Sequence, residues 1–339
     1  MKKLLICMLS LALLGAMLTA CAAKNDASTA EQPSNAVTET REETKEETKE
    51  DAEEPEEENY NTGDASLDDP RNQDGIGERE LLVVSFGTSF NDSRRLDIGG
   101  IENALAEAFP AWSVRRAFTS QIIIDHVRER DGEVIDNVHE ALERAVANGV
   151  KQLVVQPTHL MSGFEYNDLA EEVASYADAF EFVNIGGPLL NADKDFFDLA
   201  DIMENAMKEY DDGRTAIVYM GHGTDADSNY VYELMQNVLT DTGRTNFYIG
   251  TVEAYPSVHD VVARVAAGDY DRVVLRPMMV VAGDHANNDM AGDDEDSWRS
   301  TFETAEYQTE CVLEGLGRLS AIQQLYVDHA RAAMSGENG

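Results

Sequence analysis

Short apolar runs alternate along most of the chain with stretches in which apolar residues recur at helical spacing. Runs such as Leu81–Ser85 and Thr215–Met220 are nearly continuous in apolar residues, which is typical of strands covered on both faces. Val138, Leu142 and Val146 share one face of a predicted helix. The runs that we interpret as strands are Leu81–Ser85, Ser113–Phe118, Gln152–Gln156, Phe182–Ile185, Thr215–Met220, Asn246–Gly250, Arg272–Arg276 and Thr309–Leu313. The alternation predicts an α/β fold with parallel sheets and helices on both faces.

An internal repeat divides these elements into two halves. Val154–Pro157 and Val274–Pro277 are similar, and each is followed at the same interval by a glycine. Glu165 and His285 then occupy equivalent positions. Two short stretches can match by chance, but the matching order of strands favours a duplication. We therefore expect two pseudo-symmetric lobes, each with a four-stranded parallel sheet flanked by helices.

The first twenty residues have the pattern of an export signal. Lys2 and Lys3 precede an apolar segment, which ends at Leu18 and is followed by small residues and Cys21. This segment is shorter than a spanning helix needs. It resembles the lipobox of bacterial lipoproteins, in which cleavage leaves the cysteine as a lipid-modified N-terminus. A plain signal peptide or an uncleaved anchor is the alternative. We predict a lipoprotein signal peptide at residues 1–20 and an exported protein tethered to the cell membrane by lipid on Cys21.

Residues 21–79 are predicted to form an acidic, disordered tether. Between residues 22 and 80 there are six basic and twenty acidic residues, with few large apolar side chains. Such a segment cannot bury enough apolar surface to offset the entropy of ordering it. The folded part is therefore expected at residues 80–334, with one lobe at about 80–205 and the other at about 206–334.

Charge and missing motifs exclude several classes of partner. The chain carries 26 Lys and Arg against 65 Asp and Glu, a net charge of −39. Nucleic acid is an unsuitable partner because phosphate binding needs clustered basic residues. Neither a Gly-x-Gly-x-x-Gly nor a Walker sequence follows the first predicted strand, so we expect no nucleotide cofactor. After lipidation of Cys21, Cys311 would be the remaining thiol, which we interpret as a buried strand residue.

Three side chains are candidates for a metal centre. His222 follows the run Thr215–Met220, and Glu165 and His285 lie in loops after predicted strands. Ligands of α/β sheets bind beyond the carboxyl ends of the strands. If the lobes face each other, these side chains converge on one cleft. Two imidazoles and a carboxylate suit a divalent first-row metal. His159, just before the Glu165 turn, is a further candidate for the cleft.

Five longer stretches of the predicted folded part form a recognisable set. They are Leu82–Ser89, Ala117–Ser120, Met220–Gly223, Ala282–Ala286 and Asp289–Trp298. Together they resemble the family of anaerobic sirohydrochlorin cobaltochelatases, over about residues 80–334. The resemblance implies a two-lobed chelatase fold and ATP-independent insertion of Co(II) into sirohydrochlorin, in the anaerobic route to cobalamin.

The resemblance also implies roles for the candidate residues. His222 and His285 are expected to bind the metal, with His222 as the leading base. Glu165 is expected to be the active-site glutamate that holds the metal or relays protons. Because cobalamin synthesis is cytoplasmic whereas this chain carries an export signal, a second function stays open. That alternative is an extracytoplasmic protein that binds a metal, or haem or another tetrapyrrole, on a chelatase fold. A homo-oligomer is possible.

The substrate's carboxylates need local cations, because the folded part is itself acidic. Hydroxyl and backbone N–H groups around Ser85 and Thr88 could cradle an anion, although a simple helix cap explains them as well. His159 is, with Ser85 and Thr88, a third candidate for binding the substrate. The arginines near predicted strand ends are Arg94, Arg95, Arg115, Arg116 and Arg276. Of these, we take Arg94 and Arg276 as candidate substrate contacts.

Overall fold

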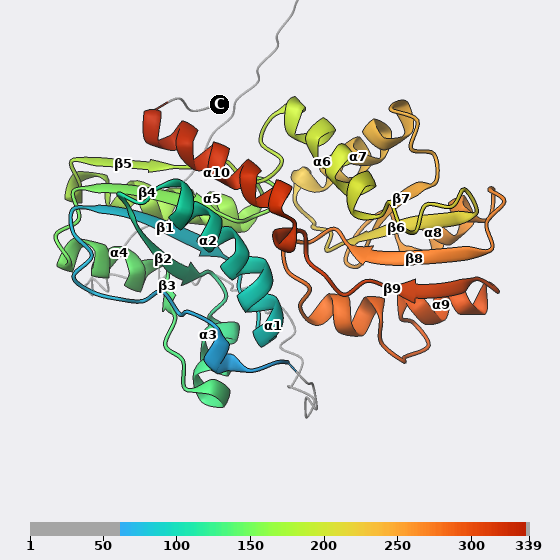
Figure 1. Cartoon of the computed structure of the whole chain (residues 1–339), viewed down its shortest axis with the longest axis horizontal. Coiled ribbons are helices and arrows are strands. Elements are labelled where there is room, and N and C mark those ends of the chain that lie inside the picture. The colour runs from blue at the N-terminus through green and yellow to red at the C-terminus, as the bar shows by residue number, and fades with distance from the viewer. Residues whose placement is uncertain (1–61, 337–339) are drawn as a thin grey trace, which may run out of the picture. The chain divides into compact units, whose positions relative to one another are not determined.

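The computed structural model of the chain describes residues 62–336. The predicted signal peptide, Cys21 and the tether up to residue 61 lie outside the described residues. The described part contains two parallel sheets, with strand orders β3-β2-β1-β4-β5 and β7-β6-β8-β9 (Figure 1). The strands are β1 (Arg79–Ser85), β2 (Ser113–Phe118), β3 (Asp136–Asn137), β4 (Gln152–Pro157), β5 (Phe182–Ile185), β6 (Thr215–Gly221), β7 (Phe247–Thr251), β8 (Arg272–Pro277) and β9 (Gln308–Cys311).

The predicted α/β class and the eight predicted strands are confirmed. The two sheets are equivalent in order, since β1, β2, β4 and β5 match β6, β7, β8 and β9. The first sheet has a fifth strand that the sequence did not predict. This strand, β3, is only two residues long and pairs with the end of β2 (Ala117 with Asp136). Its residues are polar, so no apolar run marks it.

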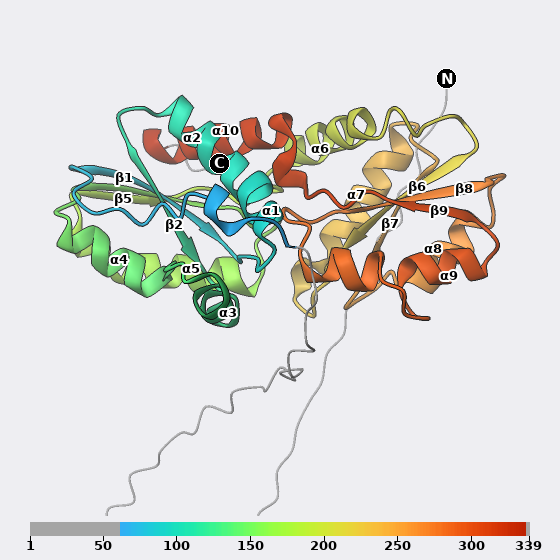
Figure 2. The same ribbon diagram turned by 60° about the horizontal axis from the view of Figure 1, so that its bottom comes forward.

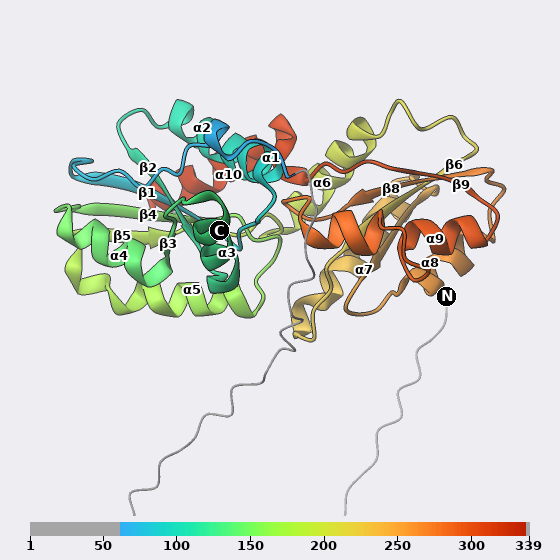
Figure 3. The ribbon, with the colours of Figure 1, turned by 90° about the horizontal axis from the view of Figure 1, so that it is seen from below.

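Helices cover both faces of each sheet. They are α1 (Asn91–Ser93), α2 (Gly99–Ala108), α3 (Gln121–Asp131), α4 (Val138–Ala147), α5 (Phe164–Ser175), α6 (Asp193–Ala206), α7 (Tyr230–Asp241), α8 (Val258–Val265), α9 (Trp298–Thr304) and α10 (Ser320–Ser335), with the π-helical turns η2 (Arg94–Ile98) and η5 (Ala286–Met290). Figure 2 shows α2 and α10 on one side of the first sheet and α4 and α5 on the other. From below, α3, α4 and α5 lie on the same side as α8 and α9 (Figure 3). Between Thr62 and Gly336, no helix is both long and apolar enough to cross a bilayer.

Two helices pack on the sheet of the other half. Helix α6 follows β5, yet it packs against α7 of the second sheet, and Tyr219 of β6 donates its hydroxyl to Met203 of α6 at 3.2 Å. Helix α10 follows β9, yet it packs on α2 and β4 of the first sheet. One apolar core therefore runs continuously through both halves. The predicted division near residue 205 places α6 in the first lobe and α10 in the second. Each of these helices packs on the sheet of the other lobe.

The carboxyl ends of the two sheets meet between the lobes. In Figure 1 the arrow of β9 points toward the first sheet, and β8 runs parallel to it. A Cβ placed on Gly283, after β8, would lie 3.2 Å from Thr88 Oγ1, after β1. One placed on Gly163, after β4, would lie 3.8 Å from Ser228 Oγ. The loops at these strand ends therefore approach one another closely across the two lobes.

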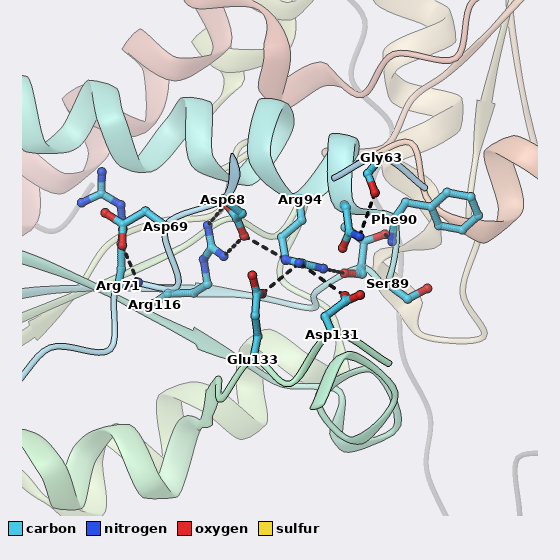
Figure 4. Close-up of polar contacts among 12 residues, drawn as sticks. Gly63, Asp68, Asp69, Arg71, Ser89, Phe90, Arg94, Arg116, Asp131 and Glu133 are labelled. Carbon is cyan, nitrogen blue, oxygen red and sulfur yellow. Dashed lines mark hydrogen bonds and ion pairs between the residues drawn. The ribbon is translucent and has the colours of Figure 1, made fainter. Parts of the chain in front are cut away.

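The N-terminal strap, residues 62–78, corrects the predicted boundary at residue 80. Its backbone is tied to the first lobe, because Asp92 N donates to Thr62 O at 2.7 Å and Arg116 N donates to Arg71 O at 3.1 Å. Asp68 is buried between two arginines, Arg94 and Arg116 (Figure 4). The last part of the predicted tether is thus ordered, because buried ion pairs hold it where apolar burial cannot.

Candidate functional site

The two candidate histidines lie side by side. His222 directly follows β6, and His285 directly precedes η5 in the loop after β8. Strand order reverses between β6 and β8, and the loops at such a point form the usual ligand site of an α/β sheet. The ring centroids are 4.6 Å apart, and the rings meet edge to face. The structure therefore brings together the two imidazoles that the sequence singled out.

In each imidazole, Nδ1 forms a hydrogen bond with a neighbouring oxygen, and Nε2 is the nitrogen that could bind a metal. His222 Nδ1 lies 2.7 Å from the carbonyl oxygen of Gly223, which can only accept a hydrogen bond, so Nδ1 carries the proton. His285 Nδ1 lies 2.7 Å from Asp289 Oδ2 and donates to that carboxylate. In the neutral form, both Nε2 atoms keep a lone pair. Such partners fix the tautomer and orientation of metal-binding histidines.

Acidic side chains surround His285. The hydrogen bond to Asp289 raises the pKa of His285 above its usual value, and the carboxylates of Asp284 and Glu253 add to the increase. The local field therefore favours positive charge at this position, whether a proton or a metal ion carries it.

Glu165 lies in the first turn of α5 and pairs with His159. Glu165 Oε2 is 3.2 Å from His159 Nε2, and the side chain of His159 is only 10 % exposed. In the region from Thr62 to Gly336, no three His, Cys, Asp or Glu side chains have the spacing of metal ligands. The structure thus places Glu165 beside His159, and it does not place its carboxylate in a ligand set with His222 and His285.

Glu253 is a further acidic residue at the histidine pair, which the sequence analysis missed. It follows β7, its N–H donates to His222 O at 2.8 Å, and its charge acts on His285. Gly223 allows this approach, since its φ is +90° and a Cβ there would lie 2.8 Å from Ala254 N. The signal in the sequence was its position at a strand's carboxyl end, the same signal that pointed to His222.

The hydroxyl candidates are buried within the first lobe. Thr158 Oγ1 and Ser85 Oγ are hydrogen-bonded at 2.7 Å, and Ser85 is 2 % exposed. Thr88 Oγ1 accepts the N–H of Phe90 at 3.2 Å. Both hydroxyls therefore support the loop after β1, and Thr88 contacts the second lobe at Gly283.

Four of the five arginines singled out in the sequence are buried and already paired, whereas the side chain of Arg95 is 32 % exposed and pairs with Asp92. Arg94 has no exposed surface and lies 2.8 Å from Asp68 and 2.9 Å from Glu133 (Figure 4). Arg276 is 2 % exposed and faces Glu314 at 3.4 Å. Arg115 and Arg116 are buried in the same way, with carboxylate partners. These guanidinium groups pair with carboxylates of their own lobe and so support the packing within each lobe. A contact of Arg94 or Arg276 with substrate stays a prediction.

Several exposed aromatic side chains lie in the segments that follow the carboxyl ends of strands. Phe86 follows β1, Phe164 begins α5, Tyr230 begins α7 and Tyr255 follows β7, and their exposed fractions run from 47 % to 63 %. Asn229 links two of them, because it precedes Tyr230 and donates to Tyr255 O at 2.9 Å. Because large exposed apolar groups often mark binding surfaces, these residues are candidates for contacts with a ligand at the strand ends.

Cys311 lies at the end of β9 and is half-buried, as a strand residue should be. Burial raises the pKa of its thiol to about 11. The thiol therefore stays protonated near neutral pH and is a poor nucleophile or metal ligand.

Comparisons with known proteins agree with this geometry. The family model described as cobalt chelatase (CbiK) matches residues 79–335. A sirohydrochlorin cobaltochelatase of Salmonella typhimurium is 35 % identical over 76 % of this chain and 97 % of its own length. The sirohydrochlorin cobaltochelatase CbiKC of Nitratidesulfovibrio vulgaris is 28 % identical, over 76 % of this chain and 91 % of its own.

A solved structure shares the fold. The structure of SirB from Bacillus subtilis with Fe3+ superimposes with a TM-score of 0.56 at 14 % identity, over 77 % of this chain and 97 % of that one. The chelatase-like arrangement of two parallel α/β lobes is therefore present in this chain.

Proposed function

Because the chain belongs to the cobalt chelatase (CbiK) family, we propose that it inserts Co(II) into sirohydrochlorin without ATP. The observation that carries the proposal is the His222–His285 pair, with its rings 4.6 Å apart and each Nδ1 engaged. Two neutral imidazoles with Nε2 left over can hold a divalent metal and give it up again.

The metal arrives at the acidic histidine pair. Carboxylates of Asp289, Asp284 and Glu253 attract a dication to His285, and Glu253 is also tied to the other histidine, since its N–H donates to His222 O. The hydrogen bonds at Nδ1 hold both rings in place while Nε2 binds Co(II). Co(II) is a substrate in this reaction, so it must be transferred from the histidines to the pyrrole nitrogens of sirohydrochlorin.

Protons leave the macrocycle as the metal enters. The macrocycle loses two N–H protons when it binds one dication. The site therefore needs side chains that can accept these protons. His222 Nε2 becomes free to accept a proton once Co(II) has moved to the ring. Glu165 accepts the other and passes it to solvent, since its side chain is 45 % exposed, with His159 beside it.

The aromatic residues at the strand ends support a flat, conjugated substrate. Phe164 and Tyr230 are both 63 % exposed, and they flank the contact between Gly163 and Ser228 that joins the two lobes. A macrocycle between the lobes would cover these rings and bring its centre to the histidines.

Variant assays test the proposal directly. The full chain is mixed anaerobically with sirohydrochlorin and Co(II), and metallation is followed by absorbance. His222→Ala and Glu165→Gln should each lose insertion while keeping their thermal stability. The matched controls His259→Ala and Glu171→Gln change exposed residues on α8 and α5 and should retain it. Unimpaired turnover in His222→Ala or Glu165→Gln refutes these roles.

For the location of the protein, we infer export and lipid attachment at Cys21. The support is the sequence pattern alone: Lys2 and Lys3, the apolar segment and Leu18-Thr19-Ala20-Cys21. In cells, the wild-type chain should sediment with membranes, whereas Cys21→Ala should not carry lipid. A soluble, unlipidated wild-type chain contradicts this inference.

A further inference from the structure

The loop that carries His285 is held from the opposite lobe. Ala282, three residues before His285, donates its N–H to Asp97 Oδ2 at 3.1 Å. Its carbonyl accepts the hydroxyl of Ser93 at 2.7 Å. Both partners come from the first lobe, at the end of α1 and in η2. Ala282 is 1 % exposed, so neither backbone group has water as an alternative partner.

Asp97 also binds the neighbouring loop of the second lobe, which contains Gly315 and Arg318. Its Oδ1 accepts from Arg318 Nε at 3.0 Å, and the N–H of Gly315 donates to the same carboxylate. That loop in turn pairs with the His285 loop, because Leu316 N donates to Met279 O at 2.8 Å. One carboxylate with no exposed surface thus joins two segments of the second lobe to the first.

We call the contacts of Ser93 and Asp97 with Ala282 the clamp. Further contacts hold the residues between Ala282 and His285. Asn287 Nδ2 donates to Gly283 O at 2.7 Å, and a Cβ on Gly283 would lie 3.2 Å from Thr88 Oγ1 of the first lobe. The backbone at Ala282 and Gly283, just before His285, is therefore held by contacts on both sides. The π-helical turn η2 widens the helix at this place and puts Asp97 against the loop, and such turns recur at functional sites.

We propose that Asp97 and Ser93 are positioning residues for the metal site: they hold Ala282 across the lobe interface and so set the distance between His285 and His222. The inference rests on the proposed function for its metal, and it goes beyond it in assigning the alignment of a second-lobe ligand to the first lobe. If Asp97 and Ser93 had a purely structural role, their replacement would lower the free energy of unfolding. The metal site of the molecules that stay folded would then be unchanged.

Two readouts on the full chain separate these cases. The first is the affinity for Co(II) alone, without sirohydrochlorin, together with the ligand-field spectrum. The second is the ¹H–¹⁵N chemical shifts of the His285 imidazole in metal-free protein. Ser93→Ala removes one hydrogen bond to Ala282, and Asp97→Asn removes the charge while keeping an oxygen acceptor. Ser113→Ala is the matched control, since its hydroxyl donates to Ile76 O at 2.6 Å at the opposite end of β2.

Ser93→Ala should weaken Co(II) binding about tenfold, the equivalent of one lost hydrogen bond, and move the His285 shifts. Asp97→Asn should do the same more strongly, and Ser113→Ala should do neither. Wild-type affinity, spectrum and His285 shifts in both clamp variants would overturn the proposal. The metal-free shifts decide it even if the wild-type chain fails to metallate sirohydrochlorin, which would count against the proposed function and not against the clamp.

Discussion

At the scale of single residues, the hydrogen-bond partner of each histidine decides what it can do. The neutral carbonyl oxygen of Gly223 fixes the tautomer of His222, whereas the charged Asp289 raises the pKa of His285. A protonated imidazole cannot bind a metal. Co(II) binding should therefore fall as the pH drops through the raised pKa of His285.

Asp289→Asn tests this dependence. The change removes the largest cause of the raised pKa, so the midpoint of Co(II) binding against pH should move to lower pH. Binding at high pH should weaken about tenfold, because an oriented partner is lost. Titrations of Co(II) binding at several pH values measure both effects. A midpoint that stays in place or rises would show that Asp289 does not set the protonation of His285.

Phe164 offers a test of the aromatic binding surface. Phe164→Ala should raise the Kd for sirohydrochlorin about tenfold or more, because a stacked ring of this size contributes on the order of 1 to 3 kcal/mol. Phe197→Ala is the control, since Phe197 is an exposed phenylalanine of similar exposed fraction, 52 %, on α6. Fluorescence quenching by the metal-free ring gives the affinities. Equal losses in both variants would remove Phe164 from the substrate site.

The sequence located the histidine pair but not all of its surroundings. His222 and His285 follow buried strands, and this position is visible in the pattern of apolar runs. Glu253 follows β7 in the same way, but it lies outside the repeat that drew attention to Glu165. The burial of the arginines could not be predicted, because the carboxylate partners of Arg94 and Arg276 come from distant segments that no local pattern reveals.

At the scale of elements, apolar runs predicted every strand that buries apolar side chains. β3 and the strap escaped prediction because polar contacts hold them. In the strap, Asp68 supplies a carboxylate to both Arg94 and Arg116, and its side chain is 2 % exposed. Composition counts such a residue as solvated and cannot tell which acidic residue finds a buried partner.

Asp68→Ala should destabilise the chain, because it leaves two buried guanidinium groups short of a counter-charge. Since Glu102 and Glu133 remain as partners, we expect a loss of about 3 kcal/mol, at the low end for a broken buried pair. The neighbouring exposed Asp69→Ala is the control. Urea unfolding measures the difference. If both variants unfold at the same urea concentration, the strap is not held by its buried carboxylate.

At the scale of the whole described part, the lobes are joined by exchange of helices. α6 packs on the second sheet and α10 on the first, and one apolar core extends through both. The periodicity of these helices predicts an apolar face, but not which sheet receives it. Joined in this way, and clamped at Asp97, the lobes can hold His222 and His285 at a set distance while the carboxyl ends of both sheets face a substrate between them.

The most direct test of the account is whether the full chain turns over. Sirohydrochlorin and Co(II) are supplied anaerobically in large excess over the protein, and the initial rate of metallation is measured at several protein concentrations. The account predicts many rings metallated per chain, at a rate proportional to protein concentration and lost in His222→Ala. Metallation that stops at one ring per chain, or that proceeds no faster than without protein, would contradict it and leave a tetrapyrrole- or metal-binding protein on a chelatase fold.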